Sequence, residues 1–304
     1  MMNAMIILNY NDFENTFNYI NRIKDYTQLD YILIVDNCST DDSFQRLSEL
    51  KNNKINIVRT DGNNGYAYGN NFGVRYLEEN HIIPENLIIS NPDIEIAEDD
   101  FNRLLVEFDH LPSDTFAISG MIYDRNMKVN EKYAWKQLSY GMIIRESTFI
   151  LNKILRCLKI KGREYGLEYV KGKKQVEVDV IPGCFFVAKY QLWKKINGFT
   201  EGTFLYFEED VLAAKAHREK YHNYVITDVK IKHFEGGTVN KNIASNWKKM
   251  KTYFYGCLFY LQNVLKIGMI KACIFKIVYH ISMVEKSIYI FLVRGIKKEY
   301  RNPD

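Results

Sequence analysis

Short apolar runs alternate with helix-compatible segments over residues 1–120, and this alternation limits the possible folds more than any other feature of the chain. The expected strands cover residues 5–8, 31–35, 55–58, 87–89 and 116–118, and the expected helices lie near residues 14–25, 42–50, 68–78 and 99–109. Runs that are apolar throughout are typical of strands buried on both faces of a parallel sheet. We therefore predict a doubly wound α/β half, in which ligands bind beyond the carboxyl ends of the strands.

The rest of the chain continues the α/β pattern less regularly. Residues 123–174 are basic and aromatic without a clean period, and we expect them to form a variable excursion. Ordered segments are expected again at residues 176–180, 184–188 and 192–196, followed by a helix at about 210–219 and a strand at 229–232. We predict one domain over residues 1–246, divided near residue 120, followed by a helical tail over residues 247–304.

The tail is basic and amphipathic. From Trp247 onward it has 11 Lys or Arg against 3 Asp or Glu, a net charge of +8, which leaves −4 for the first 246 residues. Its apolar side chains recur at steps of three and four, forming one stripe made of Ile270, Ile274, Ile277, Ile281, Val284, Ile288 and Phe291. A membrane-spanning helix needs about 20 mainly apolar residues, whereas charged residues interrupt the apolar run of this tail. We expect the tail to lie in the interface of an anionic membrane or to pack as a core or homodimer helix.

The net charge and the cysteine content limit which partners the chain can have and in which cellular compartment it works. A nucleic-acid binder would carry a basic patch on its folded domain, whereas residues 1–246 are mildly acidic, so we expect no nucleic-acid partner. The five cysteines are odd in number and form no CxxC pair, which favours reduced thiols in the cytoplasm. The first residues lack a signal-peptide pattern. We expect a cytoplasmic protein that is peripheral on the inner face of the cell membrane.

Polar residues follow the first two expected strands. Asn9 and Tyr10 end the first strand, and Asp36 and Asn37 end the second. An aspartate in this position can accept hydrogen bonds from a nucleobase or a ribose. The Ser/Thr/Asp run behind it, residues 39–42, equally suits a helix N-cap.

The third and fourth strands lead into two further polar segments. Residues 63–73, NNGYAYGNNFG, place three glycines at steps of four on one helix face, and the helix start could receive a diphosphate. Packing alone would explain the glycines but not the paired asparagines. The fourth strand ends in Asn91-Pro92-Asp93, where a proline turn presents one carboxylate. Such an oxygen ligand can serve a divalent cation on a diphosphate, although a turn alone is the simpler explanation.

The later half adds an acidic cluster and a histidine. Glu208, Glu209 and Asp210 follow an aromatic run and precede a helix. Acids at a helix start stabilise its dipole, but the apolar flanks favour a carboxylate in a partly desolvated pocket, where it can act as a general base. His233 follows a short strand and could ligate a metal or a phosphate, or be structural.

Taken together and in this order, these segments resemble the rhamnosyltransferase-like branch of glycosyltransferase family 2. The resemblance rests on NYN at residues 9–11, VDNCSTD at 35–41, the segment 63–73, NPD at 91–93, a glycine at 183 followed by GF at 198–199, FLYFEED at 204–210 and HFEG at 233–236. It covers about residues 5–260. Each segment is weakly specific alone, but seven in order are strongly specific.

The resemblance implies a GT-A fold, a doubly wound mixed sheet with a Rossmann-like N-terminal half and a helical C-terminal tail. It implies an inverting transfer of a sugar from a nucleotide diphosphate, dTDP-rhamnose or a UDP-hexose, to a hydroxyl of a lipid-linked or oligosaccharide precursor of a surface polysaccharide. The nucleotide-sugar half would cover about residues 1–120 and the acceptor half about 121–246.

The resemblance also assigns roles to single residues. The donor would be bound by Asn9, Tyr10, Asp36, Asn37, Asn64, Gly65, Asn70 and Asn91. Asp93 and His233 would hold Mg²⁺ or Mn²⁺, and Glu209 or Asp210 would deprotonate the acceptor. The usual Asp-x-Asp motif is Asn-Pro-Asp here, which leaves one carboxylate for the metal.

Two other classes of protein are compatible with parts of this pattern. A nucleotidyltransferase would share the sheet and the metal, but it should have a basic glycine-rich loop near the first strand, which residues 5–12 lack. A non-catalytic carbohydrate-binding or scaffold protein would explain the aromatic residues but would not need Asp93 together with the acidic cluster.

Overall fold

The computed structural model describes residues 2–158, 162–234 and 246–299. The chain forms two compact units, which we call the sheet unit, Met1–Gln137 with Glu164–Gly256, and the helical unit, Leu138–Arg163 with Cys257–Asp304. The predicted domain boundary between residues 246 and 247 stays a prediction, as does the division near residue 120.

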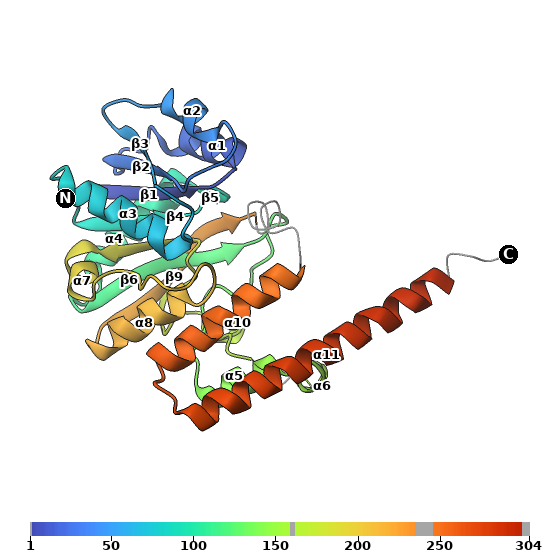
Figure 1. Ribbon diagram of the computed structural model, residues 1–304. Helices are drawn as coiled ribbons and strands as arrows, with labels where there is room; N and C mark the ends of the chain where they lie inside the picture. Colours follow the sequence, from blue (N-terminus) through green and yellow to red (C-terminus); the bar gives the residue numbers. More distant parts are fainter. Residues whose placement is uncertain (1, 159–161, 235–245, 300–304) are drawn as a thin grey trace. The chain divides into compact units, whose positions relative to one another are not determined.

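The sheet unit is built on one mixed sheet (Figure 1). Its strands, in chain order, are β1 (Asn3–Asn9), β2 (Tyr31–Asp36), β3 (Ile55–Arg59), β4 (Asn86–Ser90), β5 (Ile94–Ile96), β6 (Thr115–Tyr123), β7 (Gln175–Val178), β8 (Phe185–Lys189) and β9 (His222–His233). The order across the sheet is β3-β2-β1-β4-β8-β6-β9-β5, and β7 also pairs with β9. The predicted fold class is therefore confirmed.

The N-terminal half of this sheet is parallel. β1 pairs with β2 and β4, and β2 pairs with β3, all in parallel register. β8 then joins β4 and β6 in antiparallel register. Every residue of β4 is buried, as expected for a strand covered on both faces. The carboxyl ends of β1, β2 and β4 consequently meet at one edge of the sheet, where the polar segments of the sequence also lie.

Amphipathic helices accompany the strands of the sheet unit (Figure 1). They are α1 (Phe13–Ile23), α2 (Ser43–Ser48), α3 (Tyr66–Glu79), α4 (Glu98–His110), α7 (Tyr190–Lys195) and α8 (Glu208–Arg218), with a 3-10 turn at Leu167–Tyr169. In α4, three acids occupy the first turn, where they favour the helix dipole, and Phe101, Leu104 and Phe108 are buried.

The strand expected at residues 229–232 is the end of the longer β9, which begins at His222. The structure also contains β5, α5 (Tyr140–Ser147) and α6 (Phe149–Cys157), none of which we expected. β5 is only three residues long, and α6 buries none of its side chains. A strand of three residues is too short to leave a clear periodic signal in the sequence.

The helical unit consists of α5, α6, the end of α10 (Asn246–Asn263) and α11 (Met269–Glu299). Tyr260 of α10 is buried, and its hydroxyl donates to the carbonyl of Leu138 at 3.1 Å. Phe275 of α11 is also buried. Within the described residues, no helix combines the length and apolarity needed to cross a membrane.

Candidate active site

Asn9 and Asp36 end the neighbouring strands β1 and β2, and both are fully buried. Asn9 Nδ2 donates to Asp36 Oδ2 at 2.9 Å, and Asn9 Oδ1 accepts from the Thr16 hydroxyl at 2.8 Å. The Ser39 amide donates to Asp36 Oδ1 at 2.9 Å, and Arg59 Nε lies 3.6 Å from the same oxygen. Asp36 thus fixes the loop after β2, while its contact with a donor base stays a prediction.

Asn37 connects this loop to the start of α3. Its Nδ2 donates to the Asn63 side chain at 3.0 Å and to the Gly65 carbonyl at 3.2 Å, and its Oδ1 accepts from the Thr60 hydroxyl at 3.2 Å. Tyr10, which follows β1, is half-buried. The structure therefore brings the predicted donor residues of β1, β2 and the α3 start to one edge of the sheet.

Gly65 occupies a conformation that favours glycine. Its φ is 101°, and a Cβ built there would lie 2.3 Å from the carbonyl oxygen of Phe204. The next amide, that of Tyr66, donates to this same carbonyl at 3.0 Å. The start of α3 is therefore held directly against the segment that leads into the acidic cluster.

The two predicted donor asparagines of this segment differ in exposure. Asn64 is exposed and available to a ligand in solution. Asn70 is fully buried inside α3, and its Nδ2 donates to the Tyr66 carbonyl at 3.0 Å. Asn70 therefore supports the helix start, and its approach to a donor stays a prediction.

Asp93 and His233 form a close pair, although 140 positions separate them in the chain. His233 Nε2 lies 3.3 Å from Asp93 Oδ1, and both side chains are largely buried. The pairing of β5 with β9 aligns Ile94 with His233 and produces this approach. Burial disfavours the imidazolium, but Cys184 and Asp93 outweigh it and raise the pKa of His233 to about 11.

This pair fits part of a divalent cation site. A carboxylate and an imidazole are both ligands that Mn²⁺ accepts, and Mg²⁺ prefers the carboxylate. Within the described residues, no group of three or more His, Cys, Asp and Glu side chains has metal-binding spacing. Any cation held by Asp93 and His233 would need further oxygen ligands, which a diphosphate carries. Residues 235 and 236 of the expected HFEG segment lie outside the described residues.

A turn at Gly183 and Cys184, just before β8, connects the parts of the site. The Asn91 amide donates to the Cys184 carbonyl at 2.8 Å, next to Asp93. The Tyr66 hydroxyl, at the start of α3, donates to the Gly183 carbonyl at 2.6 Å. The Gly183 amide donates to Glu209 Oε1 at 3.2 Å. The start of α3, the segment just before Asp93 and the side chain of Glu209 thus all contact this turn.

The acidic cluster follows two strained residues. Tyr206 and Phe207 have φ values of 75° and 72°, a left-handed conformation that is unusual for aromatic residues. The Phe207 ring lies 5.0 Å from that of Tyr253 in α10, which holds the strained segment in place. Such strain is often stored at functional sites.

The three acids have different environments. Glu208 is buried, and its Oε2 has no hydrogen-bond partner among the described residues. Burial together with the charge of Glu209 raises its pKa well above the ordinary value. Asp210 is also buried, and its Oδ1 accepts from Trp135 Nε1 at 3.3 Å. Glu209 is half-buried and is the most accessible carboxylate of the three.

Several residues of this arrangement were missed as site residues by sequence reasoning. Tyr66, Cys184 and Trp135 were given no role, and Gly183 was noted only as part of the family pattern. Tyr66 and Gly183 stand inside segments that carry the resemblance, which is the signal that could have drawn attention to them. Nothing in the sequence near Trp135 marks its contact with Asp210.

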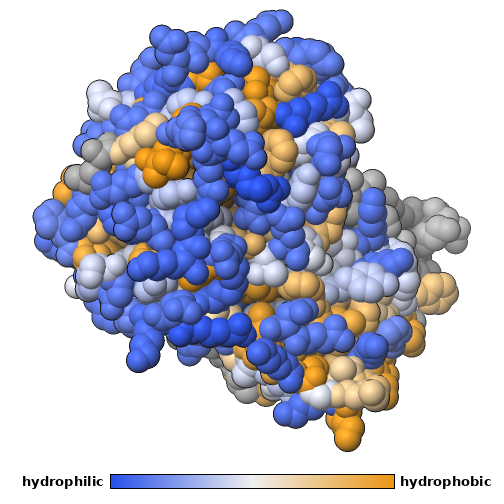
Figure 2. Space-filling view, turned by 60° about the vertical axis from the view of Figure 1, so that its left-hand side comes forward, coloured by the Kyte–Doolittle hydropathy of each residue, from blue (hydrophilic) through white to orange (hydrophobic). Residues whose placement is uncertain are grey.

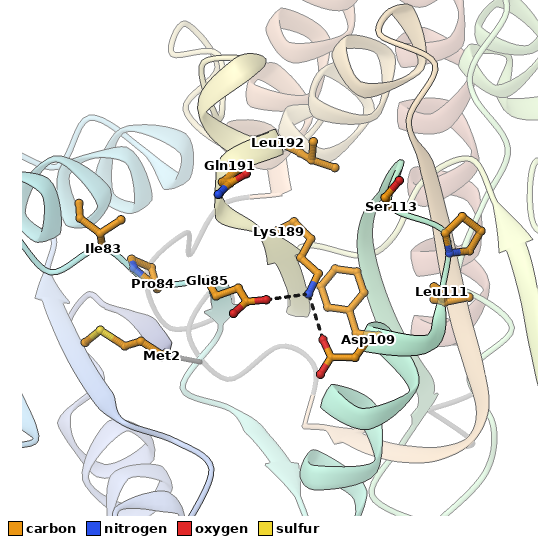
Figure 3. Close-up of a pocket in the computed structure, with 12 residues that line it drawn as sticks. Met2, Ile83, Pro84, Glu85, Asp109, Leu111, Ser113, Lys189, Gln191 and Leu192 are labelled. Atoms are coloured by element: carbon orange, nitrogen blue, oxygen red, sulfur yellow. Dashed lines mark hydrogen bonds and ion pairs between the residues drawn. The ribbon is translucent and has the colours of Figure 1, made fainter.

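A shallow cavity of about 670 Å³ lies elsewhere on the sheet unit (Figure 3). Lys189 stands inside it, 3.7 Å from Glu85 and 3.1 Å from Asp109. Met2 also lines it, just before β1, whereas the candidate site lies at the other end of β1. This cavity is therefore separate from the candidate site.

The fold and this site define a class, the glycosyltransferases of GT-A type. The mannosyltransferase PcManGT from Pyrobaculum calidifontis, solved with GDP-Man and Mn²⁺, matches with a TM-score of 0.56 at 14% identity, over 88% of this chain and 64% of that one. GalNAc-T7, solved with UDP, GalNAc and Mn²⁺, matches with a TM-score of 0.56 at 13% identity, over 77% of this chain and 44% of that one. These similarities concern the fold.

The family model of glycosyl transferase family 2 matches residues 5–185, more than half of the chain. The chain therefore belongs to glycosyltransferase family 2, and the family resemblance is confirmed. The low-salt glycan biosynthesis hexosyltransferase Agl10 of Haloferax volcanii is 27% identical over 221 residues, which are 71% of this chain and 62% of that protein. The chain thus spans less than two thirds of this relative's length. Glu209, Asp210 and His233 lie beyond the matched family segment.

Proposed function

We propose that the chain transfers a sugar from a nucleotide diphosphate to a hydroxyl of a glycan precursor, with inversion at the anomeric carbon. The observation that carries this proposal is the turn at Gly183 and Cys184. It contacts the start of α3, the segment of Asp93 and the carboxylate of Glu209. A donor phosphate, a cation and an acceptor hydroxyl would need these three groups side by side.

Glu209 is the better candidate for the general base. It is half-buried, and one of its oxygens is oriented by the Gly183 amide. Asp210 is buried and accepts from Trp135, so it supports the helix start instead. Glu209 would take the proton of the acceptor hydroxyl as the oxygen attacks the anomeric carbon. A base contributes roughly 10²–10⁴-fold to such a step.

Asp93 and His233 are the proposed ligands of Mg²⁺ or Mn²⁺. Bound there, the ion would neutralise charge on the departing nucleotide diphosphate. His233 must be neutral to ligate, so the proton that it shares with Asp93 would leave when the metal binds. Two structurally similar glycosyltransferases were solved with Mn²⁺, which supports this assignment.

Inversion follows from a single displacement. The acceptor oxygen attacks the sugar on the face opposite the diphosphate, its proton passes to Glu209, and the bond to the diphosphate oxygen breaks. The start of α3, with Gly65 and the exposed Asn64, would receive the diphosphate, as helix N-termini do for anions.

The donor sugar is proposed to be rhamnose carried by dTDP or a hexose carried by UDP. The acceptor would be a lipid-linked or oligosaccharide precursor of a surface polysaccharide or capsule. The similar hexosyltransferase of Haloferax volcanii is a glycan biosynthesis enzyme, which supports this class of acceptor. We infer a working position on the cytoplasmic face of the cell membrane, where lipid-linked precursors would be reached.

A donor panel tests the proposal directly. Purified protein with Mn²⁺ is incubated with dTDP-rhamnose, UDP-glucose, UDP-galactose and UDP-N-acetylglucosamine, and release of the nucleotide diphosphate is measured. We expect one donor to be turned over well above the others, and proton NMR of the transferred sugar to show the inverted anomer. Turnover of nucleoside triphosphates with sugar phosphates instead would indicate a nucleotidyltransferase.

A further inference from the structure

The apolar stripe of α11 faces away from its own unit. All seven of its members are exposed, with exposed fractions between 44% and 78%. The helix is anchored by other residues: Ala272 and Phe275 are buried, and the Lys271 carbonyl accepts from the Tyr140 hydroxyl at 2.9 Å. These contacts fix the orientation of α11 in its unit, and in that orientation its apolar stripe stays exposed.

A second exposed apolar set lies on α6, which contacts α11. The Ile150 amide donates to Glu285 of α11 at 3.2 Å, and the rings of Phe149 and Tyr289 lie 5.3 Å apart. Large apolar side chains on or next to α6 are nevertheless about half exposed, namely those of Ile150, Leu151, Ile154 and Leu158. Two segments far apart in the sequence thus expose apolar side chains in one unit. Figure 2 shows a mostly hydrophilic face with scattered hydrophobic residues, several of them toward its lower edge.

The charge of the helical unit is strongly positive. Residues 138–163 and 257–304 contain 14 Lys or Arg and 4 Asp or Glu, a net charge of +10, while the whole chain has only +4. The rest of the chain therefore has −6. A surface that is both apolar and basic matches the interface of an anionic bilayer, where apolar side chains enter the acyl boundary and cations meet the headgroups.

We propose that α6 and α11 form a membrane-binding surface for an anionic lipid leaflet. The α11 stripe has the spacing of a two-helix seam, but a second copy would bring two units of the same high charge together. The residues that flank the stripe, such as Lys271, Cys273, His280 and Glu285, also do not form the repeated opposite charges of a paired helix. Charge therefore favours lipid over a second copy. This surface acts independently of catalysis.

Vesicle flotation of the full chain tests the surface. The probes are vesicles of phosphatidylcholine alone and of equal parts phosphatidylcholine and phosphatidylglycerol, at low and high salt. We expect flotation with the anionic vesicles only, weakened by salt. Each basic side chain near such a surface contributes about 1 kcal/mol, or about fivefold in partition. Arg156→Glu with Lys276→Glu should therefore reduce binding by at least about 25-fold.

Apolar variants test the stripe itself. Ile277→Ser with Ile281→Ser should reduce partition by about tenfold or more, because both side chains would lose their burial in the acyl boundary. The matched control is Val106→Ser with Ile83→Ser, two similarly exposed apolar residues of the sheet unit, which should leave flotation unchanged. Circular dichroism verifies that each variant is folded.

Three outcomes decide the proposal. Flotation that is lost in the stripe variants but kept in the control supports it. Failure of the unaltered chain to float with anionic vesicles overturns it. A stable dimer in light scattering that the stripe variants convert to a monomer also overturns it, in favour of a second copy. Donor turnover without vesicles is measured in parallel, so failure of the proposed enzymatic function is distinguished from failure of membrane binding.

Discussion

The amide of Gly183 donates a hydrogen bond to Oε1 of Glu209 at 3.2 Å, and no room remains between them for a side chain. A Cβ built on Gly183 would lie 2.8 Å from this oxygen and 3.1 Å from Glu209 Cγ. The position of the proposed base therefore depends on a glycine that lies 26 residues earlier in the chain. The next residue, Cys184, accepts a hydrogen bond from the Asn91 amide, two positions before Asp93 of the proposed metal pair.

Gly183→Ala should consequently reduce kcat strongly while changing the free energy of unfolding only slightly. The added methyl group displaces the flexible end of Glu209, which costs little folding free energy but moves the base, and a shift of about 1 Å can cost roughly a hundredfold in rate. Steady-state kinetics and thermal unfolding measure the two effects. Gly141→Ala is the matched control, because a Cβ there meets no atom of the described residues within 4 Å. Equal kcat for both variants would contradict the role of this contact.

Glu209→Gln should reduce kcat by roughly 10²–10⁴-fold with donor affinity kept, because a base acts in the transition state. Asp210→Asn should act differently, lowering stability through its bond with Trp135 while sparing more of kcat. Comparing kcat, KM and the unfolding midpoint of both variants separates the two roles. Equal mild effects on kcat would mean that the cluster only caps α8.

Asp93→Asn should reduce activity at least about a hundredfold while the fold is kept, because a cation on a departing diphosphate stabilises the transition state by several kcal/mol. EDTA should abolish the activity of the unaltered chain, and added Mn²⁺ or Mg²⁺ should restore it. Asp109→Asn, on the other side of the sheet unit at the Lys189 cavity, is the control. Full turnover in EDTA would exclude the metal role.

The parallel half of the fold was predictable from sequence because its strands are mainly apolar and its helices are amphipathic. The expected strand at residues 5–8 lies within β1, and the one at 31–35 lies within β2. The short β5 was not predictable, since three residues carry too little pattern. Yet β5 is what brings Asp93 next to His233 through its pairing with β9.

The candidate site was predictable only as far as its segments resemble a family. That resemblance selected Asp93, His233 and the acidic cluster, but it could not decide which acid of the cluster is the general base. Burial distinguishes them in the structure, since Glu208 and Asp210 are enclosed and Glu209 is not. Burial of this kind depends on contacts with distant residues such as Trp135, which no local pattern encodes.

Gly65→Ala should destabilise the sheet unit and weaken donor binding. A residue with a Cβ is strained at a φ of 101°, and its methyl group would meet the backbone oxygen of Phe204 at 2.3 Å, which a side-chain rotation cannot relieve. A loss of about 1–3 kcal/mol in the free energy of unfolding is expected. Chemical denaturation and donor KM measure it. Gly62→Ala, whose Cβ would meet Asn64 only at 3.6 Å, should change neither the free energy of unfolding nor the donor KM appreciably.

The stability of the chain should depend on pH through Glu208. Glu208 is buried, and no residue in the described part of the chain bonds its Oε2. Burial, with the charge of Glu209, raises its pKa well above the ordinary glutamate value. Between the ordinary pKa and the raised one, the unfolded chain has released this proton while the folded chain retains it. The folded state therefore binds more protons in that window, and its stability falls as pH rises through it.

Glu208→Gln removes this ionisation with almost no change in shape. The variant should therefore unfold at a higher temperature than the unaltered chain at neutral pH, and the difference should shrink toward acidic pH, where Glu208 is protonated in both states. Glu219→Gln, an exposed glutamate at the other end of α8, is the control and should leave the pH profile unchanged. Thermal unfolding at a series of pH values measures both. A difference between Glu208→Gln and the unaltered chain that stays constant with pH would mean that Glu208 does not titrate differently on folding.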